Sequence, residues 1–345
     1  MRPDLEDAFR QQATECRRLG SPFNGLLCEL LAQRLDDSKR FGRTLGSWAG
    51  PPVSDALALR AAGALHGLAR SGRAPRLTAQ YPPRAGEPES LWEAIEEALA
   101  PHEAFLCEYL ERPPQTNEVA RSSALLGGAL LIAERTGLPM SWHEIGASAG
   151  LNLAFDRYRY QLGPAHYGHP GAPVRISSLW EGALPPLGAP LQVAERAGAD
   201  LSPLPASSIA SRERLMSYIW PDQPERMERT QAALDVAAVA PWRVEQAAAG
   251  DWVAARFACA PTQDRVRVLA HTLVWQYLSE TERDAITAVM NEAGRRATPR
   301  AQLAWFGMEA DGVRDGAALH LTLWPGGERA LVGRADFHGR WVRWL

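Results

Sequence analysis

The chain has 345 residues, more than one typical hydrophobic core needs and enough for two domains. The hydrophobic fraction is 46%, the charged fraction 22% and the net charge −3, so no basic excess favours nucleic acid as a partner. Four scattered cysteines indicate neither a zinc site nor a disulfide framework, and no signal-peptide core or membrane span is apparent. We therefore expect a reduced, cytoplasmic protein.

The first part of the chain has helical patterns joined by proline-rich linkers. Apolar residues repeat at helical spacing in 24–35, 54–70, 90–110 and 121–137. The last of these segments contains ALLGGALLIA, the longest apolar run of the chain. Because no strand pattern precedes residue 140 or so, we predict an N-terminal helical domain over residues 1–137.

From residue 138 onward, strand and helix patterns alternate. Strand patterns lie at 139–146, 191–200, 242–251 and 264–278. Helix patterns lie at 151–160 and 222–238, and a third, at 279–294, follows the last of these strands. Three more strand patterns follow at 301–310, 318–324 and 330–337. This order predicts an α/β domain over residues 138–345, with a Rossmann-like, doubly wound sheet and an antiparallel C-terminal edge that includes a hairpin through WPGGERA. Such a sheet resembles that of the class I S-adenosylmethionine (SAM) methyltransferases.

The stretch HEIGASAGLNL (143–153) places a glycine loop after the first strand, where open α/β sheets bind ligands. It does not fit the dinucleotide fingerprint G-x-G-x-x-G. It resembles the first motif of the SAM methyltransferases, with a serine in place of the middle glycine. We expect the cofactor SAM to bind here, although a glycine turn without a ligand also fits the motif. The expected cofactor-binding residues are Glu144, Gly146, Ser148, Gly150 and Asn152.

Two acids follow the next two strand patterns. In the methyltransferase pattern, an acid after the second strand binds the ribose hydroxyls and one after the third binds the adenine amino group. Asp200 and Asp251 lie at these positions, and Glu181 is a rival for the ribose. Each could instead be a solvated loop residue or a helix cap.

His271 lies in the strongest strand pattern, where this fold presents its reacting groups. A histidine there could act as the general base for a hydroxyl or amine, and Tyr277 is a second catalytic candidate. Trp275 and Gln276 could form a pocket wall. The alternative for His271 is a core histidine bonded to the backbone.

Two polar stretches could bind the substrate. QTNEVARSS, ahead of the glycine loop, offers Asn117, Glu118 and Arg121, and YIWPDQPER offers Trp220 for stacking on a flat group. The alternative is that both stretches only cap helices.

The same loop also reads as G-x-S-x-G, the nucleophile elbow of the α/β-hydrolases. A serine esterase would then use Ser148 with Asp311 and His338, which have the required order. The helical patterns before the loop and the lack of an HGGG-type stretch argue against this alternative. A third alternative is a ligand-binding protein that has the fold without catalysis.

Several segments together resemble a bacterial family of proteins with a domain of unknown function, numbered 2332. They are SPFNGLL, ALHGLARSG, QTNEVARSSALLGG, HEIGASAGLNL, YIWPDQPERMER, HTLVWQYL and LWPGGERALVGRADFHGRWV. The resemblance covers nearly the whole chain and implies no activity. The expected function is SAM-dependent methyl transfer to a small molecule. This expectation rests on the order of strands and helices and on the positions of Asp200 and Asp251.

Overall fold

The computed structural model describes residues 2–84, 87–313 and 315–345. It divides into a helical unit, Met1–Thr116 with Ile209–Glu228, and a sheet unit, Asn117–Ser208 with Arg229–Leu345. Residues 117–137 therefore pack with the sheet, and residues 209–228 pack with the helices, unlike the predicted single boundary at 137. Among the described residues, no helix combines the length and the apolar character that crossing a membrane requires.

The helical unit is built around one apolar core, which includes Phe9, Leu27 and Leu65. Its helices are α1 (Pro3–Arg18), α2 (Pro22–Arg34), α3 (Arg40–Gly46), α4 (Leu57–Arg70), α5 (Pro75–Thr78), α6 (Pro88–Leu99), α7 (Glu103–Glu111) and α9 (Ile209–Ser217). The returning segment closes this core. The ring of Tyr218 lies against Gly63, where a Cβ atom would come within 2.4 Å of it.

The described residues of the sheet unit form one sheet of 11 strands, in the order β3-β2-β4-β11-β10-β9-β8-β7-β1-β5-β6. The strands are β1 (Met140–Ile145), β2 (Arg159–Leu162), β3 (Ala165–Tyr167), β4 (Arg175–Gly182), β5 (Val193–Asp200), β6 (Val244–Gln246), β7 (Arg265–Thr272), β8 (Ala301–Glu309), β9 (Ala317–Trp324), β10 (Glu328–Ala335) and β11 (Trp341–Trp344).

The five strands β6-β5-β1-β7-β8 are parallel, which confirms the predicted mostly parallel sheet. From β1 the chain adds β5 and β6 on one side, and then returns to add β7 and β8 on the other. Their connections contain α10 (Pro224–Ala238), α11 (Ala249–Phe257) and α12 (Glu280–Arg295). The reversal of strand order lies between β1 and β7, the position where open α/β sheets bind ligands.

The C-terminal strands form an antiparallel meander, β8-β9-β10, and the predicted hairpin joins β9 to β10. They are not the edge of the sheet, because β11 and then β4, β2 and β3 continue it. The last three come from the segment after β1. The helix predicted over 151–160 is therefore wrong: a short 3₁₀ helix, η2 (Asn152–Arg157), leads directly into β2. The hydroxyl group of Tyr160 donates to Phe155 O at 2.6 Å and helps to hold this turn.

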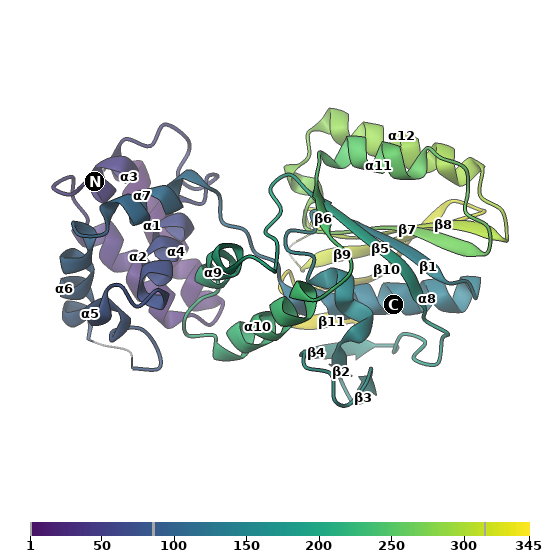
Figure 1. Ribbon diagram of the computed structural model, residues 1–345, viewed down its shortest axis with the longest axis horizontal. Coiled ribbons are helices and arrows are strands. Elements are labelled where there is room, and N and C mark those ends of the chain that lie inside the picture. Colours follow the sequence, from purple (N-terminus) through teal and green to yellow (C-terminus); the bar gives the residue numbers. More distant parts are fainter. Residues whose placement is uncertain (1, 85–86, 314) are drawn as a thin grey trace. The chain divides into compact units, whose positions relative to one another are not determined.

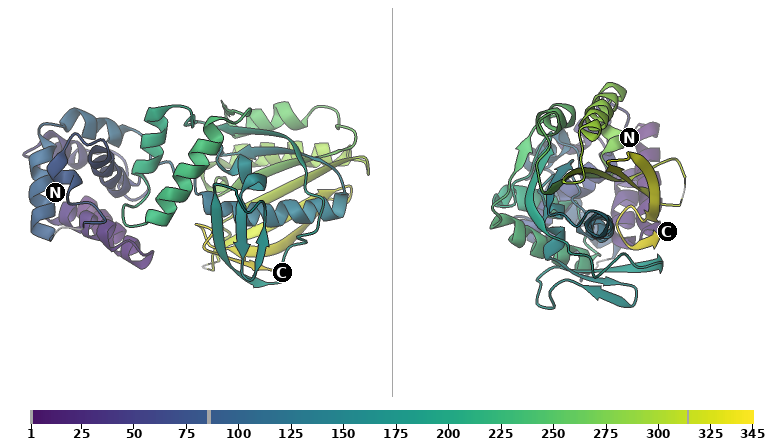
Figure 2. Two further views of the ribbon diagram at one scale, coloured as in Figure 1. Left: turned by 60° about the horizontal axis from the view of Figure 1, so that its bottom comes forward. Right: turned by 90° about the vertical axis from the view of Figure 1, so that its right-hand side faces the viewer.

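Helix α8 (Ser122–Thr136) lies inside the curve of this sheet, while α11 and α12 cover the opposite face (Figures 1 and 2). Its contacts span the sheet. A Cβ atom at Gly127 would meet Trp344 of β11, and one at Gly128 would meet Phe306 of β8. A helix that is apolar all round is buried on all sides, which explains the long apolar run of the sequence.

Candidate functional site

The glycine loop follows β1 at the reversal of strand order. Three of its residues have left-handed backbones: Gly146 at φ 68°, Ser148 at φ 52° and Gly150 at φ 71°. At Gly146 a Cβ atom would also come within 2.6 Å of Val274, in the loop after β7. Glycine is thus required there both by its backbone and by the close approach of the neighbouring loop.

The backbone amides of residues 147–151 all donate hydrogen bonds within the protein. Their acceptors are Ala199 O for Ala147 (3.0 Å), Asp200 Oδ2 for Ser148 (2.9 Å), Asn117 Oδ1 for Ala149 (3.3 Å) and Leu151 (3.1 Å), and Ala147 O for Gly150 (2.7 Å). A loop that binds phosphate instead points free amides at the anion. This loop is therefore unsuited to the pyrophosphate of a dinucleotide.

Two carboxylates lie at the loop. Asp200 ends β5, as predicted, and its second oxygen accepts from Ser202 N at 2.9 Å. Glu144 lies in β1 with 1% of its surface exposed, and its Oε2 has no hydrogen-bond partner in the described structure. Burial raises the pKa of Glu144 to about 8; the positive charge of Arg121 opposes this shift and the negative charge of Asp200 adds to it.

Other predicted binding residues surround the loop but bind protein groups. Besides the Asn117 bonds, Asn152 Oδ1 accepts from the hydroxyl of Ser122 at 2.8 Å. Glu118 forms an ion pair with Arg229 at 3.2 Å. Arg121 Nε donates to Phe337 O at 2.8 Å. Asn117 therefore positions the loop, and a role in substrate binding stays a prediction for Asn117, Glu118 and Arg121.

Three predicted residues lie elsewhere than their sequence patterns suggested. Asp251 does not end a strand, because β6 stops at Gln246 and Asp251 lies exposed in the first turn of α11. Glu181 lies in β4, five strands away from β7, and pairs with Arg343 at 2.9 Å, so it is no rival for the ribose. Trp220 belongs to the helical unit.

His271 lies near the end of β7, as predicted, and both ring nitrogens are engaged. The indole N–H of Trp305 donates to Nε2 at 2.8 Å, and Nδ1 lies 2.7 Å from Glu309 Oε1. Because an indole nitrogen can only donate, Nε2 is unprotonated and Nδ1 carries the hydrogen. The ring of Trp275 stacks on His271 with centroids 5.1 Å apart, whereas the side chain of Tyr277 is exposed to solvent.

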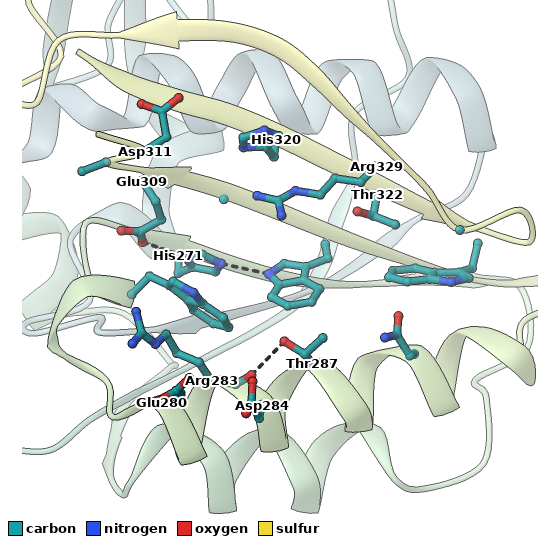
Figure 3. Close-up of a pocket in the computed structure, with 17 residues that line it drawn as sticks. His271, Glu280, Arg283, Asp284, Thr287, Glu309, Asp311, His320, Thr322 and Arg329 are labelled. Atoms are coloured by element: carbon teal, nitrogen blue, oxygen red, sulfur yellow. Dashed lines mark hydrogen bonds and ion pairs between the residues drawn. The ribbon is translucent and has the colours of Figure 1, made fainter. Parts of the chain in front are cut away.

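His271 stands at one end of a groove of about 520 Å³ between α12 and the face of β8, β9 and β10 (Figure 3). Residues at alternate positions of β8 and β9 form its floor, since their side chains share one face of the sheet. Those from β8 are Trp305, Gly307 and Glu309, and those from β9 are His320, Thr322 and Trp324. The volume lies within the usual range of small-molecule pockets.

The esterase triad is not assembled. The hydroxyl of Ser148 is buried and has no hydrogen-bond partner in the described ranges, so neither His338 nor any other described histidine is bonded to it. Asp311 is bound by both terminal nitrogens of Arg334, at 2.8 and 2.9 Å. The amide of Ala149, which an elbow would use for the oxyanion, donates to Asn117. Only the left-handed backbone of Ser148 resembles the elbow.

Residues 6–344 match the family described as "Uncharacterized protein conserved in bacteria (DUF2332)". The chain belongs to this family. Membership confirms the resemblance seen in the sequence segments, and no curated protein and no solved structure matches the chain. The activity of this DUF2332 protein must therefore be argued from its own site.

Sequence reasoning missed most of the groove in this DUF2332 chain. Trp305 and Glu309 were not predicted, although Trp-x-Gly-x-Glu in β8 has the spacing of two that places side chains on one face. Arg283 and Arg329 were missed too. They come from α12 and β10, and no local pattern indicates that these elements face each other.

Proposed function

We propose that this protein is a SAM-dependent methyltransferase that acts on a small molecule, with the cofactor at the glycine loop. One observation carries the proposal: the loop at the reversal of strand order has no free amide over residues 147–151, yet two carboxylates, Glu144 and Asp200, lie beside it. Such a loop suits a cofactor without phosphates and with positive charge. SAM carries both an ammonium and a sulfonium group.

Glu144 fits this cofactor because a buried carboxyl group whose Oε2 lacks a partner gains most from an added cation. We assign the ammonium group to Glu144 and the ribose hydroxyls to Asp200. Asp200 lies at the carboxyl end of β5, where it already accepts from the amides of Ser148 and Ser202, and a carboxylate can accept two hydrogen bonds from a diol. Asp251, at the start of α11, is our candidate for the adenine amino group.

The bound cofactor would supply an electrophilic methyl group, and the protein would chiefly position the acceptor for in-line attack. His271 is our candidate for the base that takes the acceptor's proton. Its unprotonated Nε2 accepts a hydrogen bond from the indole of Trp305. To act as the base, His271 must give up this bond and accept a hydrogen bond from the methyl-acceptor molecule instead.

Calorimetric titration with S-adenosylhomocysteine tests the proposal. We expect micromolar binding to the wild type and at least tenfold weaker binding to Asp200→Asn and Glu144→Gln. Glu328→Gln is the control: Glu328 is an exposed residue at the start of β10, and this variant should bind as the wild type does. Asparagine keeps one acceptor oxygen for the loop, so the Asp200 variant tests charge more than folding.

Absence of S-adenosylhomocysteine binding to the wild type would overturn the proposal. A serine esterase would instead be labelled by a fluorophosphonate probe and would lose the label in Ser148→Ala, a variant that should still bind S-adenosylhomocysteine if our proposal is right. Binding without methyl transfer in a broad acceptor screen would favour a ligand-binding protein of the same fold.

A further inference from the structure

The groove between α12 and the sheet holds two arginines without partners on opposite walls. Figure 3 shows Arg283 on α12 and Arg329 on the strand side of the groove. Neither guanidinium group makes a hydrogen bond or ion pair with any residue that the structure describes. Arg283 is partly buried and Arg329 is exposed. Because a guanidinium group binds a carboxylate or phosphate through paired hydrogen bonds, two such groups facing one cavity indicate a site for an anion from outside the protein.

No carboxylate among the described groove residues forms an ion pair with either arginine. Asp311 is already bound by Arg334. Glu309 Oε1 is occupied by His271 and by Val274 N at 3.0 Å, whereas its buried Oε2 has no hydrogen-bond partner in the described structure. Glu280 and Asp284 are exposed in the first turns of α12, where the helix dipole favours negative charge. Burial lowers the pKa of neighbouring His320, and the positive charge of Arg329 adds to this shift while Asp311 opposes it.

Tryptophans line the groove from end to end. At one end, Trp275 stacks on His271 and lies 5.5 Å from Trp305, centroid to centroid. At the other end, Trp324 is clamped between Gly294 of α12 and Gly327 of the hairpin, where Cβ atoms would come within 2.4 and 2.6 Å of its ring. Indole walls favour flat ligands, because stacked rings gain contact area at little cost in conformational entropy.

We propose that this groove binds a planar aromatic molecule with a carboxylate or phosphate group, held by Arg283 and Arg329 against the ring of Trp305. The ring would fill the tryptophan-lined floor, and the anion would lie between the two guanidinium groups. The inference concerns a second ligand, and it does not depend on a cofactor at the glycine loop.

Calorimetric titration of the full chain, without any cofactor, tests this proposal. The probes are 2-naphthoate and 2-naphthyl phosphate, and the comparison ligands are 2-naphthylmethylammonium and cyclohexanecarboxylate. We expect saturable binding of at least one aromatic anion and at least tenfold weaker binding of both comparison ligands. Whichever of the two anions binds more tightly shows whether the groove prefers a carboxylate or a phosphate group.

Arg283→Gln and Arg329→Gln should each weaken binding of the aromatic anion about tenfold or more, as expected when a charge-assisted hydrogen bond is lost. Arg295→Gln is the matched control, because Arg295 is an exposed arginine of the same helix that pairs with Glu292. Unchanged near-ultraviolet circular dichroism would show that each variant is folded. Three results would overturn the proposal: no saturable anion binding, tighter binding of the cation, or full affinity in the double arginine variant.

Discussion

Glu144 shows how strongly the fold can change the chemistry of one residue. Its carboxyl group has the usual pKa of 4.5 in an unfolded chain and, through burial, a pKa of about 8 in the folded protein. Between these two values the folded state holds a proton that the unfolded state releases. Wild-type stability therefore falls as the pH rises from 4.5 to 8, and this loss is complete above 8.

Glu144→Gln should remove this pH dependence, because glutamine has a similar shape and does not ionise. We expect the melting temperature of the variant, relative to the wild type, to rise by several degrees between pH 5 and pH 8.5. Differential scanning fluorimetry across that range measures it, with Glu328→Gln as the exposed control. Parallel curves for wild type and variant would show that Glu144 is not the titrating group.

The same carboxyl group should make cofactor binding depend on pH, if our proposed function holds. A cation binds the ionised form of Glu144, and below pH 8 only a shrinking fraction of the folded protein has that form. We expect the affinity for S-adenosylhomocysteine to fall about tenfold for each pH unit below 8. A calorimetric series from pH 8.5 to 6.5 checks this slope, which Glu144→Gln should lack.

Helix α8 packs against strands from different parts of the curved sheet. Its two adjacent glycines let Trp344 and Phe306 approach the helix backbone from different strands of the curved sheet. A helical glycine usually costs stability relative to alanine, by about 1 kcal/mol. The glycines in α8 are thus explained by packing, since a Cβ atom there would displace an aromatic ring.

Gly128→Ala should therefore destabilise the protein, by about 1–3 kcal/mol, through overpacking against Phe306. Gly46→Ala in α3 is the matched control, because a Cβ atom at Gly46 meets nothing within 4 Å and alanine there favours the helix. Urea unfolding followed by circular dichroism compares the two. Equal effects of both substitutions would contradict the packing explanation.

At the scale of the whole molecule, the chain leaves the helical unit at Thr116 and returns to it for residues 209–228. The return completes the unit. His66 Nδ1 lies 3.0 Å from Ser217 O, and Asp222 accepts from Phe23 N at 2.8 Å, at the first turn of α2. Asp222 thus caps a helix some 200 positions away in the sequence.

A fragment of residues 1–116 should consequently fold poorly by itself. It lacks the backbone acceptor for His66, the cap of α2 and the ring that covers Gly63. Joining residues 209–228 to it through a flexible linker should restore a cooperative thermal transition and dispersed amide resonances in NMR spectra. If the fragment 1–116 alone gave both, the returning segment would be no part of its core.

Local patterns determined much of this protein from the sequence alone. The periodicities of apolar residues predicted α2, α4, α6, α7 and α8 and the strands β1, β5 and β7, because each pattern reports which face of one element is buried. The capping box at Ser279 was right as well: its side chain accepts from Glu282 N at 3.2 Å. The glycine loop and Asp200 came together as the order of elements predicted.

The tertiary structure alone decided which distant segments meet. No local pattern places β4 beside β11, turns residues 159–162 into a strand or brings Trp305 to His271, 34 positions away. These contacts depend on the curvature of the sheet around α8, and curvature is a property of all its strands together. The sequence by itself therefore located the loop of the candidate site, whereas folding decided the state of His271 and created the groove beside it.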